Sequence, residues 1–167
     1  MEAQDVLDVL AVLGQDGLDP VLDGGWGIDA LLGAQHRDHD DLDLVVPVDQ
    51  VDRTLSSLAS VGFTVAEDLR PTRLALADAA DRRIDLHLVA PGADGDLWQE
   101  GGDPGGGDLR YPASEVTSGW VGGQPVRCIG ATLQAAHHGG YEPRPRDRKD
   151  LDLLQRQFGV SPPPGYR

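Results

Sequence analysis

Three aspartates occupy two segments whose alternation is typical of β-strands. Residues 41–46 read Asp-Leu-Asp-Leu-Val-Val, so Asp41 and Asp43 share one face of a strand while the leucines share the other. Residues 83–88 read Arg-Ile-Asp-Leu-His-Leu, which puts Asp85 and His87 on one face. If the two strands are neighbours in one sheet, Asp85 joins Asp41 and Asp43.

Carboxylates in this pattern suit a divalent cation. Two aspartates on one strand face lie about 6–7 Å apart, and Mg²⁺ prefers oxygen ligands that it shares with substrate phosphates. Three converging carboxylates are costly without a cation, and the third can accept the proton of an attacking hydroxyl. The alternative for either strand alone is an acidic, solvated face without a ligand.

A glycine turn precedes the acidic pair. Gly24 and Gly25 lie between a short apolar strand and a helix, where backbone N–H groups and the helix dipole favour a phosphate. Alone, this turn is equally typical of simple chain reversal. Arg37 follows the turn, and its guanidinium could bind a triphosphate through two hydrogen bonds; the alternative is that it is an exposed basic residue without a ligand. His39 is expected to order the strand that carries Asp41.

The surrounding elements predict an α+β fold. Periodicity and stop signals indicate helices over 3–13, 26–32, 51–59, 131–138 and 146–158. Strands are expected over 21–22, 41–46, 63–65, 72–76, 83–89 and 126–129. We expect one domain over 1–167, built on a mixed sheet of about four to five strands with helices mainly on one face. A Gly-rich loop at 91–108 and a tail at 160–167 complete it.

Composition limits the partners. The chain has 14 basic and 28 acidic residues and a formal charge of −14, which disfavours nucleic acid and favours a cationic small molecule. The alternative is that the charge serves solubility alone. No long apolar run predicts a membrane span, and Cys128 is the single cysteine, which reads as a buried apolar residue. We expect a cytoplasmic protein.

These motifs together resemble the nucleotidyltransferase superfamily of the DNA polymerase β type. The similarity is greatest to the small lincosamide and aminoglycoside antibiotic nucleotidyltransferases. It covers nearly the whole chain in the family's order. The matching stretches are 22–29 (Leu-Asp-Gly-Gly-Trp-Gly-Ile-Asp), Arg37-x-His39-x-Asp41-Leu42-Asp43, 84–87 (Ile-Asp-Leu-His), 125–129, 138–142 and Asp147-x-x-Asp150.

The resemblance implies a role for each motif. Gly24 and Gly25 would lie under the nucleotide phosphates, with Arg37 and His39 as further nucleotide-binding residues. Asp41 and Asp43 would bind Mg²⁺, and Asp85 would complete the acidic triad as metal ligand and general base. It also implies a possible homodimer, with partner residues near the substrate. The 101–108 stretch would border the acceptor pocket, with Trp98, Glu100, Asp103 and Tyr111 as candidate lining residues.

The predicted function is Mg²⁺-dependent transfer of AMP from ATP to a hydroxyl of a small molecule, releasing pyrophosphate. A lincosamide-type antibiotic is the first acceptor to consider, which would make the protein a resistance enzyme. The alternatives are an aminoglycoside, another metabolite, a protein acceptor, or a catalytically inactive nucleotide-binding partner protein. The complete set of three acids argues against the inactive alternative.

Overall fold

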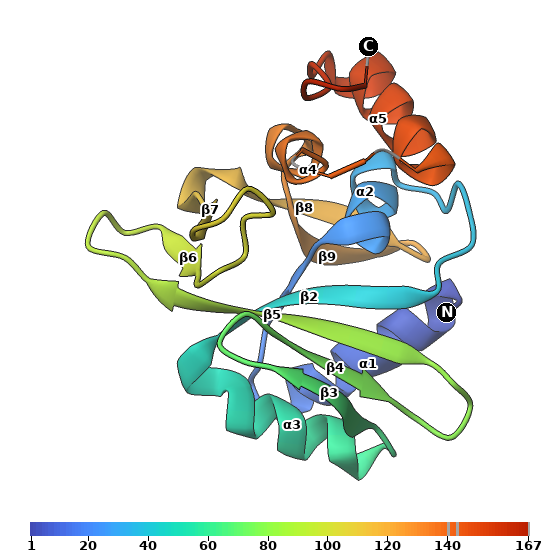
Figure 1. Ribbon diagram of the computed structural model, residues 1–167. Helices are drawn as coiled ribbons and strands as arrows, with labels where there is room; N and C mark the ends of the chain where they lie inside the picture. Colours follow the sequence, from blue (N-terminus) through green and yellow to red (C-terminus); the bar gives the residue numbers. More distant parts are fainter. Residues whose placement is uncertain (140, 143, 167) are drawn as a thin grey trace.

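The computed structural model describes residues 1–139, 141–142 and 144–166. It confirms an α+β architecture (Figure 1). The helices are α1 (Ala3–Gln15), α2 (Gly24–Leu32), α3 (Val51–Ser60), α4 (Ala131–His137) and α5 (Pro145–Phe158). The strands are β1 (Val21–Leu22), β2 (Asp41–Pro47), β3 (Thr64–Leu69), β4 (Arg73–Ala77), β5 (Arg83–Pro91), β6 (Leu97–Gln99), β7 (Leu109–Tyr111), β8 (Val116–Val121) and β9 (Gln124–Ile129).

The strands form one mixed sheet. Its order is β3-β4-β5-β2-β1-β9-β8, with β6 paired to β5 and β7 to β6. The β2–β5 and β1–β9 pairs are parallel, and the other pairs are antiparallel. The mixed sheet was predicted, but it has nine strands where about four to five were expected.

The extra strands lie where the sequence has little alternation. Leu97–Gln99 forms β6 inside the segment predicted as a loop over 91–108, and β7 follows directly after that segment. Each has three residues, too few to show a period of two. Strand β8 contains Gly119, where an added Cβ would lie 2.5 Å from the backbone of Ala30. This glycine lets α2 pack closely on the sheet.

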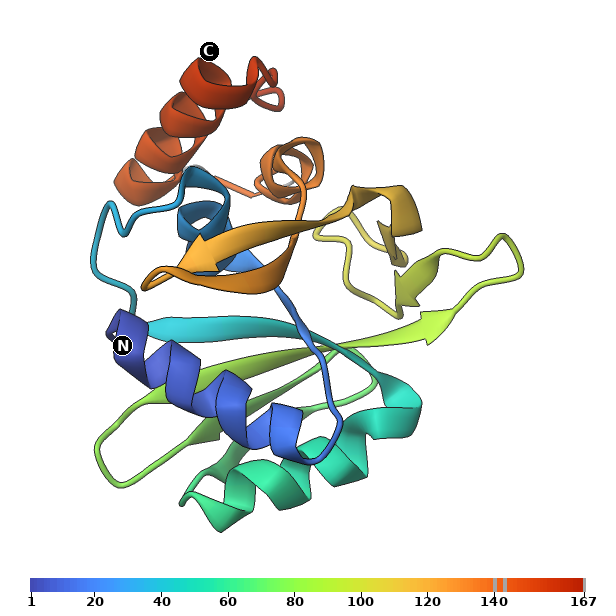
Figure 2. The ribbon, with the colours of Figure 1, turned by 180° about the vertical axis from the view of Figure 1, so that it is seen from behind.

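The apolar faces of β2 and β5 form the main core. Leu42, Leu44, Ile84 and Leu86 are all fully buried and belong to a cluster that includes residues of α1, α2 and α3. Seen from behind, α1 and α3 run side by side along this side of the sheet (Figure 2). Because the leucines of β2 and β5 face this core, the aspartates between them face the other way.

The remaining helices pack on the side of the aspartates. Leu133 of α4 belongs to a second cluster with Val21 of β1 and Val45 of β2. Leu151 and Leu154 of α5 pack instead against α2 and α4. These two helices therefore border the space in front of the acidic residues.

Two further predictions concern single features. Cys128 is fully buried in β9, as expected. Among the described residues, no helix combines the length and the apolar character needed to cross a membrane.

Candidate active site

The two acidic strands meet as predicted. In the parallel β2–β5 pair, Asp43 is directly opposite Asp85, and Asp41 is opposite Arg83. Asp41 and Asp43 line a cleft of about 610 Å³ that also borders α2, α4 and the start of α5. The alternation seen in the sequence therefore brings all three predicted aspartates to the same face of adjacent strands.

The charges of these aspartates are not fully balanced. Burial raises the pKa of Asp41 above its ordinary value, and the nearby charges of Asp43 and Asp85 raise it further. Burial also raises the pKa of Asp85, although the Arg73 guanidinium opposes this effect. Arg73 Nη1 lies 2.5 Å from Asp85 Oδ2, so Asp85 has a cationic partner, whereas no cation of the described residues makes such a direct contact with Asp41.

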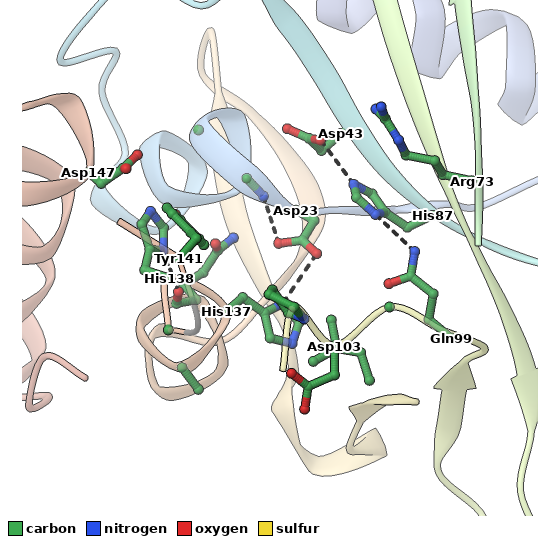
Figure 3. Close-up of a pocket in the computed structure, with 18 of the residues that line it drawn as sticks. Asp23, Asp43, Arg73, His87, Gln99, Asp103, His137, His138, Tyr141 and Asp147 are labelled. Atoms are coloured by element: carbon green, nitrogen blue, oxygen red, sulfur yellow. Dashed lines mark hydrogen bonds and ion pairs between the residues drawn. The ribbon is translucent and has the colours of Figure 1, made fainter. Parts of the chain in front are cut away.

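A network of polar side chains from β5 and β6 contacts Asp43. His87 Nε2 lies 3.0 Å from Asp43 Oδ1, and the Gln99 amide lies 3.2 Å from His87 Nδ1 (Figure 3). Burial alone would lower the pKa of His87, but the contact with Asp43 raises it to about 9. Gln99 is fixed in turn because it donates to the carbonyl of Thr72 at 2.9 Å. This network holds the Asp43 carboxylate in one orientation.

The glycine turn lies directly against the acidic pair. The Asp23 side chain accepts the N–H of Gly24 at 2.7 Å, and α2 begins there. Gly24 has a φ of +56°, and an added Cβ would lie 2.1 Å from Asp43 Oδ2. A Cβ on Gly25 would lie 2.3 Å from His39 Nδ1 and 2.6 Å from Arg37 Nη2. Only residues without a side chain allow the helix N-terminus to approach these groups so closely.

The other two predicted binding residues have internal partners. Arg37 lines the cleft and makes a bidentate contact with the buried Asp150 of α5, through Nε at 3.1 Å and Nη2 at 2.8 Å. His39 is buried, and its Nε2 lies 2.5 Å from Asp29 Oδ2 in α2. His39 therefore connects α2 to the start of β2, and it lies outside the lining of the cleft. Its role as a nucleotide-binding residue stays a prediction.

The cleft has a basic lining that the sequence motifs did not predict. Besides Arg37, it contains Arg73 from β4 and Arg144 and Arg146 from the region where α5 begins. These residues are scattered through the chain and belong to no spaced motif. Of the four residues suggested for the acceptor pocket, Asp103 and Tyr111 line the cleft, whereas Trp98 and Glu100 lie outside its lining.

The aspartates suit a cation but are not arranged as a finished metal site. Within the described residues, no three His, Cys, Asp or Glu side chains stand as a ready ligand group. In this structure Asp43 contacts His87, and Asp85 contacts Arg73. Asp41 and Asp43 nevertheless offer hard oxygen donors whose mutual repulsion a divalent cation would relieve.

A strand pair carrying acids, beside a glycine-rich helix start, is the arrangement of a nucleotidyltransferase. The sequence profile of the aminoglycoside-2''-adenylyltransferase family matches residues 5–154, and the chain belongs to this family. It is accordingly an enzyme of the nucleotidyltransferase class.

Individual relatives agree with this assignment. The chain is 27% identical over 134 residues to a lincosamide resistance protein from Staphylococcus haemolyticus, covering 80% of this chain and 82% of the relative. It is 32% identical over 120 residues to a 2''-aminoglycoside nucleotidyltransferase from Klebsiella pneumoniae, covering 72% of this chain and 63% of that protein.

Solved structures share the fold. The lincosamide antibiotic adenylyltransferase LnuA with bound lincomycin superposes with a TM-score of 0.78 at 24% identity, covering 91% of this chain and 95% of LnuA. ANT(2")-Ia in complex with adenylyl-2"-tobramycin gives a TM-score of 0.71 at 20% identity, covering 94% and 89% of the two chains.

Proposed function

We propose that the protein transfers AMP from ATP to a hydroxyl of a lincosamide-type antibiotic and releases pyrophosphate. The observation that carries the proposal is the approach of the Gly24–Gly25 turn to Asp43. A Cβ on Gly24 would lie 2.1 Å from the carboxylate, so a phosphate held by the turn would be adjacent to the acidic pair.

Asp41 and Asp43 would hold Mg²⁺ in this proposal, and Asp85 would join them once Arg73 moves aside. The bound metal would supply positive charge against the phosphate oxygens, where negative charge develops during transfer. His87 would keep Asp43 oriented toward the cleft.

The residues of the chain would divide the remaining work. Arg37, Arg73, Arg144 and Arg146 line the cleft and would bind the triphosphate. Asp85 would take the proton of the acceptor hydroxyl while the hydroxyl oxygen forms a bond to the α-phosphorus. The bond from that phosphorus to the bridging oxygen breaks, and pyrophosphate leaves with the electron pair.

The acceptor assignment depends on charge and on relatives. Lincosamides carry a protonatable amine, and a chain with a formal charge of −14 attracts cations. An aminoglycoside is the second candidate, favoured by the family assignment and by the 32% identity to a 2''-aminoglycoside nucleotidyltransferase. The proposed compartment is the cytoplasm, where ATP is available.

The test is pyrophosphate release with ATP and Mg²⁺, measured against lincomycin, tobramycin and related antibiotics. Release with lincomycin that is lost in Asp43→Asn and Asp85→Asn supports the proposal. Asp49→Asn, at an exposed aspartate after β2, is the matched control and should keep full activity. Release with tobramycin alone would favour the aminoglycoside. Unchanged turnover in Asp43→Asn would overturn the metal assignment.

A homodimer is a separate proposal. Strand β8 is at an edge of the sheet, and its Trp120 is 55% exposed. An exposed edge strand with a large aromatic residue is a surface that a second copy can cover. Light scattering on the purified protein should give about twice the chain mass of 17.8 kDa, and Trp120→Glu should give the monomer. A monomeric wild type would refute this proposal.

A further inference from the structure

Helix α4 contributes two polar side chains to the cleft wall whose hydrogen bonds are incomplete. Gln134 is 0% exposed, and neither its Oε1 nor its Nε2 has a hydrogen-bond partner among the described residues. His137, three positions later on the same helix, has a buried Nε2 in the same condition. Both side chains line the cleft that contains Asp41 and Asp43.

Such groups require an explanation. Removing an amide from water without giving it a partner is unfavourable, and folded proteins leave few buried polar groups unpaired. The helix itself does not require an amide at this position, since Leu133 and Ala135 on either side are apolar. Gln134 therefore retains a costly polar group that serves no other described residue.

The surroundings of His137 fix its ring. Its Nδ1 lies 3.5 Å from Asp23 Oδ2 (Figure 3), and its ring lies edge-on to Tyr111 with centroids 4.8 Å apart. Nδ1 of the ring therefore faces Asp23, and Nε2, which has no hydrogen-bond partner among the described residues, is left for a ligand.

The three unpaired atoms indicate the kind of group that would satisfy them. Gln134 offers an acceptor oxygen and a donor NH₂ group, and His137 Nε2 accepts or donates according to where the ring carries its protons. A phosphate only accepts and an ammonium only donates, whereas a hydroxyl does both. Gln134 lies near the start of α2, because a Cβ on Gly27 would be 2.3 Å from its Nε2. The subsite is therefore within one helical turn of the Gly24–Gly25 turn.

We propose that Gln134 and His137 form a hydrogen-bonding subsite for the hydroxyl groups of a sugar ring, either the nucleotide ribose or a ring of the acceptor. The inference rests on the proposed function, since it places one substrate in the same cleft. The Gln134 amide must turn toward the cleft to reach a ligand. This rotation breaks no hydrogen bond, because the amide makes none with the described residues.

The experiment uses Gln134→Met, which keeps the side-chain length and removes both polar atoms. Binding is measured by calorimetry for Mg-ATP, for its 2′-deoxy and 3′-deoxy analogues, and for lincomycin and tobramycin with a non-hydrolysable ATP analogue present. We expect one substrate to bind about 5- to 30-fold more weakly. The melting temperature should stay the same or rise, because an unpaired buried amide has been removed.

Two further variants complete the set. His137→Phe keeps an aromatic ring beside Tyr111 and should weaken the same substrate as Gln134→Met. Gln155→Met makes the same chemical change at an exposed position of α5 and should bind every ligand as the wild type does.

The outcomes separate the two sources of the hydroxyl. If the ribose is bound, the wild type prefers ATP to a deoxy analogue and Gln134→Met loses that preference. If the acceptor is bound, the variant weakens the antibiotic and leaves ATP unchanged. Less than a twofold change for every ligand would overturn the subsite. A wild type that binds no Mg-ATP would overturn the proposed function itself.

Discussion

Gly24→Ala is the most informative single substitution, because the structure separates its effect on the fold from its effect on the site. The residue has a φ of +56°, and a Cβ would lie 2.1 Å from Oδ2, 2.7 Å from Cγ and 3.2 Å from Cβ of Asp43. The left-handed backbone costs about 1–2 kcal/mol for a residue with a side chain. In a chain of this size, that corresponds to a fall of about 2–8 °C in melting temperature.

The catalytic effect should be much larger. The Asp43 carboxylate must move away from the new methyl group, which breaks its 3.0 Å contact with His87 and displaces it from the metal position. A displacement of about 1 Å at a reacting centre can reduce the rate about 100-fold. The assay is antibiotic-dependent pyrophosphate release at saturating ATP and Mg²⁺.

Gly33→Ala is the matched control in the same helix. Gly33 ends α2 with a φ of +74°, and outside its own turn no atom of the described residues lies within 4 Å of its added Cβ. The control should lose the part of the stability that comes from the left-handed backbone and keep nearly full activity. Equal loss of activity in both variants would refute the reasoning, because backbone strain alone would then explain the result.

Three other predictions test separate parts of the structure. Arg37→Gln should lower the free energy of unfolding by about 2–4 kcal/mol, because it leaves the buried Asp150 without its cation. Chemical denaturation measures this change. A loss below about 1 kcal/mol would contradict the role of the ion pair. The pKa of Asp23 is lowered to about 2 in the folded protein, so the ionised carboxylate stabilises the fold by about 2 kcal/mol above pH 4. This contribution is lost as the pH falls toward 2. Stability measured between pH 5 and 2 should therefore fall less steeply in Asp23→Asn, and parallel curves would exclude this role. Burial raises the pKa of Cys128 to about 11, so the native thiol should resist a disulfide reagent that reacts at once in denaturant. Rapid labelling of the native protein would contradict this burial.

The sequence allowed the central strands to be predicted because their residues alternate strictly. Asp41, Asp43 and Asp85 could be placed on one face because Leu42, Leu44 and Leu86 require the other. The short β6 and β7 could not be found this way, since their pairing depends on β5 and not on their own pattern.

The same limit applies to the cleft lining. Gln134 stands in a run of small and apolar residues where a polar side chain is usually exposed, and only the packing of α4 against α2 buries it. Arg73 sits at the start of a predicted strand without any motif around it. Its importance follows from the β4–β5 pairing, which places it beside Asp85.

The arginines of the cleft show how an acidic protein can accommodate a triphosphate. Each is held by a carboxylate: Arg37 by Asp150, Arg73 by Asp85, Arg144 by Asp147 and Arg146 by Asp40. Except for Arg73, which would leave Asp85 when a metal binds, these pairs fix flexible side chains before a ligand arrives, so less conformational entropy is lost when phosphate binds. They also keep four positive charges together where mutual repulsion would otherwise separate them. A net charge of −14 is thus compatible with binding a triphosphate in this cleft, because the acids beside the cleft orient the cations that line it.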